Sequence, residues 1–223
     1  MRDLMDTILK YLKWPMAALM LVMFLPAFNA DLYLVRHTLN GPFFIKFVLP
    51  VIGVFGVWFF IPGLSGSHFA IFEHEFTHMF AALLTFHRPK SLKIVPDEGG
   101  SFGFYGEGNW LITLAPYFIP TFPILMMLFS VIWLHLGYLL PYMFLPVLGM
   151  IFGYHLVSNA SQIHGEQTDF AKAGWIFSVL FLPTANLLTF GFVWAFAAHH
   201  WHGVFGWGQL LLHETENVLQ RLF

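Results

Sequence analysis

Six long apolar segments divide this sequence, and they restrict the folds open to it more than any other feature. A helix needs roughly 20 mostly apolar residues to cross a bilayer, and each segment is near or above that length. Hydrophobic residues make up 58% of the chain and charged residues only 10%, whereas soluble domains average about 25% charged residues. Lipid must therefore cover much of the surface, and we predict an all-α polytopic membrane protein with about six transmembrane helices. The segments span residues 14–30, 43–62, 68–86, 110–136, 138–157 and 170–198.

The pattern indicates one membrane domain, residues 1–223, with an amphipathic segment at each end. In segment 1–13, apolar residues recur at helical spacing opposite charged ones, and segment 204–223 carries a similar apolar stripe. Either segment suits the membrane interface or the flank of the helical bundle. Asp3 and Asp6 precede the first apolar run, unlike the basic start of a signal peptide, so we expect the first helix to be retained.

A polar stretch at 87–109 interrupts the apolar segments, and it is where strands are expected. Residues 91–95 and 101–105 alternate in character around the turn-forming sequence Pro96-Asp-Glu-Gly-Gly100. Two such runs around a Pro- and Gly-rich turn are typical of a β-hairpin. We therefore predict a short β-hairpin directly after the third apolar segment.

Composition limits the chemistry available to the chain. Because there is no cysteine, any transition-metal site must be built from His, Asp and Glu. The net charge of −2 gives no reason to expect a nucleic-acid partner.

The third apolar segment contains the motif His74-Glu-Phe-Thr-His78. Residues four apart on a helix share a face, so His74 and His78 can hold one zinc ion through their imidazole nitrogens. Glu75 then lies beside the metal, where it can take a proton from a water that zinc has acidified. We predict that His74 and His78 are metal ligands and that Glu75 is a general base.

The position of this motif within an apolar run supports a functional interpretation. Ionisable side chains are costly in hydrocarbon, and within transmembrane segments they usually mark a functional interior. The alternative is a set of buried polar residues that satisfy one another, with Glu73 or Glu75 bonded to a histidine.

The run His74-Glu-Phe-Thr-His78-Met-Phe-Ala-Ala82 resembles the active-site helix of the site-2-protease family of intramembrane metalloproteases, in which HExxH is followed by alanine four residues on. That family also has a membrane-associated β-hairpin and then a proline-containing helix, and residues 109–116 fill the latter place. The resemblance covers a metalloprotease-like core at 68–190. Two features depart from the pattern: Thr77 stands where the family often has glycine, and the family's third ligand lies in an Asp-Gly motif that is missing here.

The third ligand must come from another part of the chain, and the stretch 154–169 holds the candidates. Asp169 begins a helix roughly as the family's aspartate does, although N-capping would also explain an aspartate there. His155, near the end of an apolar helix, is the alternative ligand, and His164 and Glu166 remain open. Two asparagines at membrane depth, Asn109 and Asn159, are candidate oxyanion or substrate contacts, or else they bond backbone left free by kinked helices.

The function these features favour is an intramembrane zinc metalloprotease with one zinc ion, acting on a membrane-protein or peptide substrate. We expect a multi-pass protein of the bacterial inner (cytoplasmic) membrane, with further complex partners unknown. One alternative is a protease-fold subunit of a membrane complex that has no proteolytic activity. Another is a di-iron desaturase or hydroxylase, for which the histidines at 74–78 and 199–202 would form the boxes.

Overall fold

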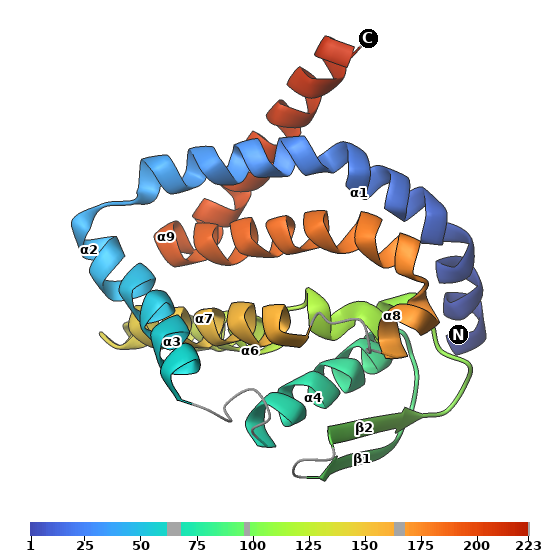
Figure 1. Cartoon of the computed structure of the whole chain (residues 1–223). Coiled ribbons are helices and arrows are strands. Elements are labelled where there is room, and N and C mark those ends of the chain that lie inside the picture. Colours follow the sequence, from blue (N-terminus) through green and yellow to red (C-terminus); the bar gives the residue numbers. More distant parts are fainter. Residues whose placement is uncertain (62–67, 96–98, 163–167, 223) are drawn as a thin grey trace.

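The fold, seen in a computed structural model, is a bundle of helices with one small sheet (Figure 1). The structure describes residues 1–61, 68–95, 99–162 and 168–222. Its elements are α1 (Arg2–Thr38), α2 (Gly41–Phe43), the π-helix η1 (Phe44–Val48), α3 (Leu49–Phe60), α4 (His68–Leu84), β1 (Pro89–Val95), β2 (Gly99–Phe104), α5 (Trp110–Leu114), the 3₁₀-helix η2 (Ala115–Tyr117), α6 (Thr121–His135), α7 (Phe144–Gln162), α8 (Thr168–Ala173) and α9 (Trp175–Leu222).

The two longest helices, α1 and α9, lie side by side along one flank of the molecule (Figure 1). Polar side chains join them at depth, where a hydrogen bond has no water to compete with it. Trp194 Nε1 donates to Thr38 Oγ1 at 2.8 Å, and Trp207 Nε1 donates to Asp31 Oδ1 at 2.9 Å. Helix α9 breaks at His200, whose φ of 52° is left-handed. The part of α9 after this break crosses α1 (Figure 1).

The described residues do not confirm the six membrane-crossing helices that were predicted. Within the part of the chain that the structure describes, four helical stretches are long and apolar enough to cross a bilayer: Arg2–Thr38, Gly41–Phe60, Phe144–Gln162 and Trp175–Arg221. A bent pair, Trp110–Tyr117 with Thr121–His135, meets at 85° and brings the number to five if it counts as one span. The sixth expected segment is α4, whose described 17 residues carry the polar motif. The prediction of an all-α membrane protein is confirmed, whereas the span count of six is not.

The predicted hairpin is present. Strands β1 and β2 pair antiparallel, with Ser91 opposite Gly103 and Lys93 opposite Ser101. Part of the expected turn, 96–98, lies outside the described residues. The hairpin packs against α4 near the N-terminal end of α1 (Figure 1).

A small apolar cluster holds α4 against the elements that follow it. Ala81, Ala82, Ile112 and Ala115 are buried together, with Phe102 packed against them. Ala82 is the alanine four residues beyond the motif, and its small side chain lets the backbone of α5 approach α4. This cluster fixes the face of α4 that carries the two histidines.

Thr77, the residue that departs from the family's glycine, is also accommodated by packing. Its hydroxyl donates to the Glu73 carbonyl oxygen at 2.9 Å and lies 2.9 Å from the Thr121 hydroxyl. Both threonine side chains are buried. The Thr77 hydroxyl thus donates within its own helix and can accept from Thr121 where α6 begins, so the larger residue is accommodated between the helices.

Candidate metal centre

Helix α4 places the two motif histidines on one face, as the spacing predicts. Their Nε2 atoms lie 3.1 Å apart, and both rings are largely buried. Two imidazole nitrogens this close, with neither side chain turned to solvent, suit a shared partner between them.

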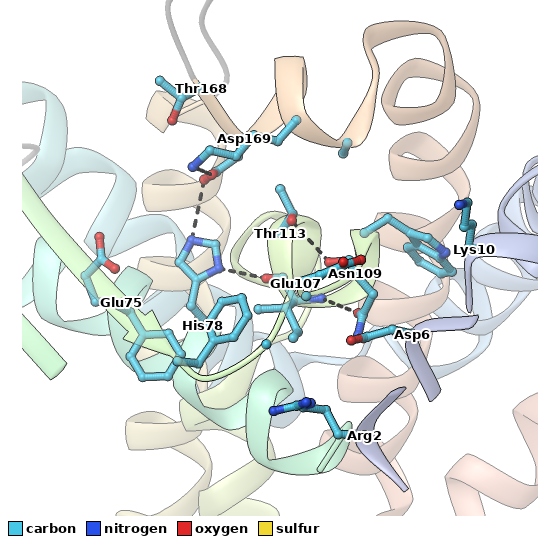
Figure 2. Close-up of a pocket in the computed structure, with 18 of the residues that line it drawn as sticks. Arg2, Asp6, Lys10, Glu75, His78, Glu107, Asn109, Thr113, Thr168 and Asp169 are labelled. Atoms are coloured by element: carbon cyan, nitrogen blue, oxygen red, sulfur yellow. Dashed lines mark hydrogen bonds and ion pairs between the residues drawn. The ribbon is translucent and has the colours of Figure 1, made fainter. Parts of the chain in front are cut away.

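The third side chain of the group is Asp169, in the first turn of α8. Its Oδ2 atom lies 3.5 Å from His74 Nε2 and 3.4 Å from His78 Nε2. Among the residues that the structure describes, these three form the one group of His, Asp and Glu side chains arranged to hold a metal ion. Figure 2 shows Asp169 and His78 facing each other, with Glu75 to one side.

The spacing of the three atoms fits one zinc ion. Zinc bound at about 2.0–2.1 Å in tetrahedral geometry separates its ligand atoms by about 3.3–3.4 Å. The three observed separations run from 3.1 to 3.5 Å. Two imidazoles and one carboxylate also form a donor set that zinc accepts in catalytic sites, where the fourth position stays open.

Each histidine is oriented through its other ring nitrogen. His78 Nδ1 donates to the Ile112 carbonyl oxygen at 2.7 Å, and His74 Nδ1 donates to Gln162 Oε1. A carbonyl oxygen can only accept, so the proton sits on Nδ1 and leaves Nε2 free to bind a metal. Gln162 is held in turn, because its amide donates to Ser158 Oγ at 2.9 Å.

Gln162 is a partner of a candidate ligand that sequence reasoning missed. The available signal was an amide near the end of a largely apolar helix, because such a group needs a partner at membrane depth. The role of Ile112 had no signal in the sequence, since its backbone makes the contact.

The Asp169 carboxylate has two further partners and a low proton affinity. Tyr117 donates its hydroxyl to Oδ2 at 3.2 Å, and Lys172 Nζ lies 3.7 Å from Oδ1. Burial raises the pKa of the Asp169 carboxyl, but His74 and His78, when their Nε2 atoms are protonated, donate to it and lower its pKa below the usual value. Its oxygens therefore face the imidazoles as an anion, the form that binds metal.

Glu75 lines the same cavity as the two histidines without joining the three-atom group. Its side chain is 8% exposed, and it accepts a hydrogen bond from the backbone of Phe102 in β2. Gly100 in the same strand comes so close that a Cβ there would lie 2.6 Å from Glu75 Cγ. The hairpin thus fixes the position of this carboxylate.

The alternative ligand, His155, points to a different partner. Its Nδ1 lies 3.8 Å from Glu73 Oε1, and both side chains are buried. At 3.8 Å the two groups are within ion-pair distance but beyond hydrogen-bond distance, and the pair does not involve Glu75. His164 and Glu166 lie outside the described residues.

The two asparagines have structural bonds where the structure places them. Asn109 caps α5 by accepting from Ile112 N at 3.1 Å, and it lines the main cavity. Asn159 donates to Asn186 Oδ1 at 2.9 Å and borders a small separate cavity behind His74. A substrate or oxyanion contact stays a prediction for both.

The cavity in front of the three-residue group has a volume of about 1100 Å³. That is slightly above the roughly 300–1,000 Å³ typical of ligand pockets. Its walls come from α4, β2, α5, α8 and the N-terminal end of α1. The two histidines therefore lie at the wall of a cavity large enough to hold a ligand.

The fold and this site define an integral membrane protein with a buried His-His-Asp group at the wall of a large cavity. The family model for Peptidase M50B-like proteins matches residues 49–195, more than half of the chain, and the chain belongs to this family. The match contains the whole of α4, the hairpin and Asp169, and it supports a protease role. No curated protein and no solved structure matches the chain significantly.

Proposed function

We propose that the protein is an intramembrane zinc metalloprotease that hydrolyses peptide bonds of membrane-protein substrates. The observation that carries this proposal is the convergence of three ligand atoms within 3.1–3.5 Å of one another beside Glu75. We assign His74, His78 and Asp169 as the ligands of one zinc ion. The peptidase family of the chain supports this assignment.

Glu75 is the general base of the proposed reaction. Zinc, when bound, supplies a Lewis acid that polarises the carbonyl and acidifies a water. The Glu75 carboxylate takes a proton from the attacking water as the new carbon–oxygen bond forms. It then delivers that proton to the leaving nitrogen as the carbon–nitrogen bond breaks. Its burial keeps competing water away from this transfer.

The hairpin gives the substrate a backbone template. A helical substrate must unwind before its peptide bond is accessible, and its freed backbone groups then need partners. β2 pairs with β1 along one edge, and Gly100, Ser101 and Phe102 of β2 line the cavity. Strand addition along β2 would hold an extended substrate next to Glu75.

Gly100→Ala tests whether the hairpin positions the base. The new methyl group meets Glu75 Cγ and Ile71 Cγ2, each at 2.6 Å, so the strand or the carboxylate must move. We expect kcat to fall roughly 10–100-fold, because a displacement of about 1 Å costs on that order, with zinc content unchanged. The matched control is Gly103→Ala, whose methyl group meets only the flexible Ser91 hydroxyl at 2.7 Å. Equal rates for the two variants would contradict this role.

Metal removal tests the proposed function itself. The purified protein, in lipid vesicles, is given a single-span model helix that carries an Asn-Pro pair and a fluorescent reporter. We expect one zinc ion per chain by mass spectrometry, and cleavage that stops after chelation and returns with zinc. Metal bound without cleavage would favour the non-proteolytic subunit, and two iron ions per chain would favour the oxidase.

A further inference from the structure

The N-terminal end of α1, residues 2–13, forms a wall of the cavity although it lies outside the family match at 49–195. Two contacts attach this segment to the elements that precede α6. Trp110 Nε1 donates to the Leu9 carbonyl oxygen at 2.8 Å, and Arg2 Nη1 donates to the Tyr105 carbonyl oxygen at 3.5 Å. The segment is therefore docked against α5 and the end of the hairpin.

The Asp6 carboxylate bonds this segment to two neighbouring parts of the chain. Its Oδ1 accepts from Asn109 Nδ2 at 2.7 Å, and its Oδ2 lies 3.1 Å from His87 Nε2. The carboxylate is 14% exposed, so both bonds are largely shielded from water. One carboxylate thus joins α1 to two elements that flank the motif helix.

His87 is held rigidly at the end of α4. Phe86 adopts a left-handed φ of 62°, and His87 N then donates back to the Ala82 carbonyl oxygen at 2.7 Å. A non-glycine residue in this conformation is uncommon, and the hydrogen bond is that of a Schellman cap. The His87 side chain is buried, and its Nδ1 faces the Thr85 carbonyl oxygen at 3.0 Å. Asp6 therefore meets a fixed partner.

A continuous path of hydrogen bonds leads from Asp6 to a proposed zinc ligand. Asn109, held by Asp6, accepts from the Ile112 N–H at 3.1 Å. The carbonyl oxygen of the same residue accepts from His78 Nδ1 at 2.7 Å. Figure 2 shows Asp6 beside Asn109, with His78 across the cavity. Helix α5 has five residues, too few to hold its shape alone, so its place depends on such anchors.

We infer that Asp6 is a positioning residue of the metal centre, acting through Asn109 and α5 on the orientation of His78. This inference rests on the proposed zinc-protease function and adds to it a residue from outside the family-matched region. The N-terminal segment is then part of the site and not only a membrane anchor. Removal of the carboxylate frees the Asn109 side chain, loosens the cap of α5 and lets the Ile112 carbonyl drift from His78.

The test is Asp6→Ala in the full-length protein, read by zinc affinity in competition with a chromophoric chelator. Loss of an outer contact to a metal ligand typically lowers metal affinity by about 10–100-fold, and we expect the zinc affinity of Asp6→Ala to fall about tenfold. In the metal-free protein, the amides of 110–114 should exchange with deuterium faster. Asp6→Asn should restore both readouts, because its amide oxygen still accepts from Asn109. The matched control is Glu216→Ala, which removes an exposed carboxylate near the C-terminal end of α9 and should change neither readout.

A double-mutant cycle checks the path. In an Asn109→Ala background, Asp6→Ala should cause no further loss of zinc affinity, because the path is already cut. Zinc affinity and exchange equal to those of Glu216→Ala would overturn the inference. If Asp6→Ala does not fold, Asp6→Glu provides the same test, since its longer side chain misplaces the carboxylate. If the wild-type protein binds zinc but cleaves nothing, the proposed protease function is wrong. The inference about Asp6 is then still decided by the zinc affinity of its variants.

Discussion

Replacing Glu75 with glutamine should abolish peptide hydrolysis and leave one zinc ion bound. The amide keeps the shape of the side chain beside His74 and His78 but cannot accept the proton of the attacking water. A positioned general base contributes about 10²–10⁴-fold to rate, so we expect kcat to fall by at least two orders of magnitude. The measurement is the cleavage rate of the reporter helix in vesicles, with zinc content determined on the same sample.

Glu73→Gln is the matched control for this experiment. Glu73 is the neighbouring acid in α4 and is as deeply buried, but its carboxylate faces His155 instead of the main cavity. The control should keep its cleavage rate within a few-fold of the wild type. Unimpaired cleavage by Glu75→Gln would refute the base assignment, whereas equal losses in both variants would point to damaged packing of α4.

The local parts of the site were predictable from sequence because helical spacing determines them. His74 and His78 lie four residues apart, and one turn of helix brings them together whatever the rest of the chain does. The hairpin could be predicted for a similar reason, since alternating runs on either side of a Pro- and Gly-rich turn can pair locally. In both cases the contacts form between residues that are close in sequence.

The contacts between the motif and residues far away in the sequence could not be predicted from local spacing. Asp169 follows His78 by 91 residues, and the sequence alone left it in competition with His155. Whether Asp169 or His155 faces the motif depends on how α8 and α7 pack against α4, and no local sequence pattern records that packing. Gln162 acts through its side chain and Ile112 through its backbone, and neither role has a spacing rule. The sequence placed Asp6 only in the amphipathic segment 1–13. Helical periodicity indicates which face of a helix a residue occupies, but not which residue it contacts.

The span count differed for a physical reason. Hydropathy marks apolar runs, but it does not show where a run bends. The segment predicted at 110–136 is two helices at 85°, and Pro120 stands at the break, just before α6. The segment at 68–86 carries the motif, and its polar side chains face the cavity instead of lipid. Burial inside protein is what makes such a helix tolerable at membrane depth.

Asp169→Ala should remove the metal, and His155→Ala should not, which separates the two candidate third ligands. The Asp169 carboxylate lies 3.4 and 3.5 Å from the two imidazoles, whereas His155 faces Glu73. Loss of an outer contact to a metal ligand lowers metal affinity by about 10–100-fold. Loss of a ligand itself should therefore weaken zinc binding by about 100-fold or more. Chelator competition measures the affinity, and cleavage should fall in step with zinc content.

His155→Ala should act on stability instead. It leaves the buried Glu73 carboxylate without its imidazole, and a buried polar group that loses its partner costs about 1–3 kcal/mol. We therefore expect a lower thermal midpoint with unchanged zinc affinity. The reverse pattern, in which His155→Ala loses zinc and Asp169→Ala retains it, would make His155 the third ligand. Asp169→Asn refines the test, because it keeps the acceptor for the Tyr117 hydroxyl but removes the anion. It should bind zinc less tightly than the wild type and more tightly than Asp169→Ala.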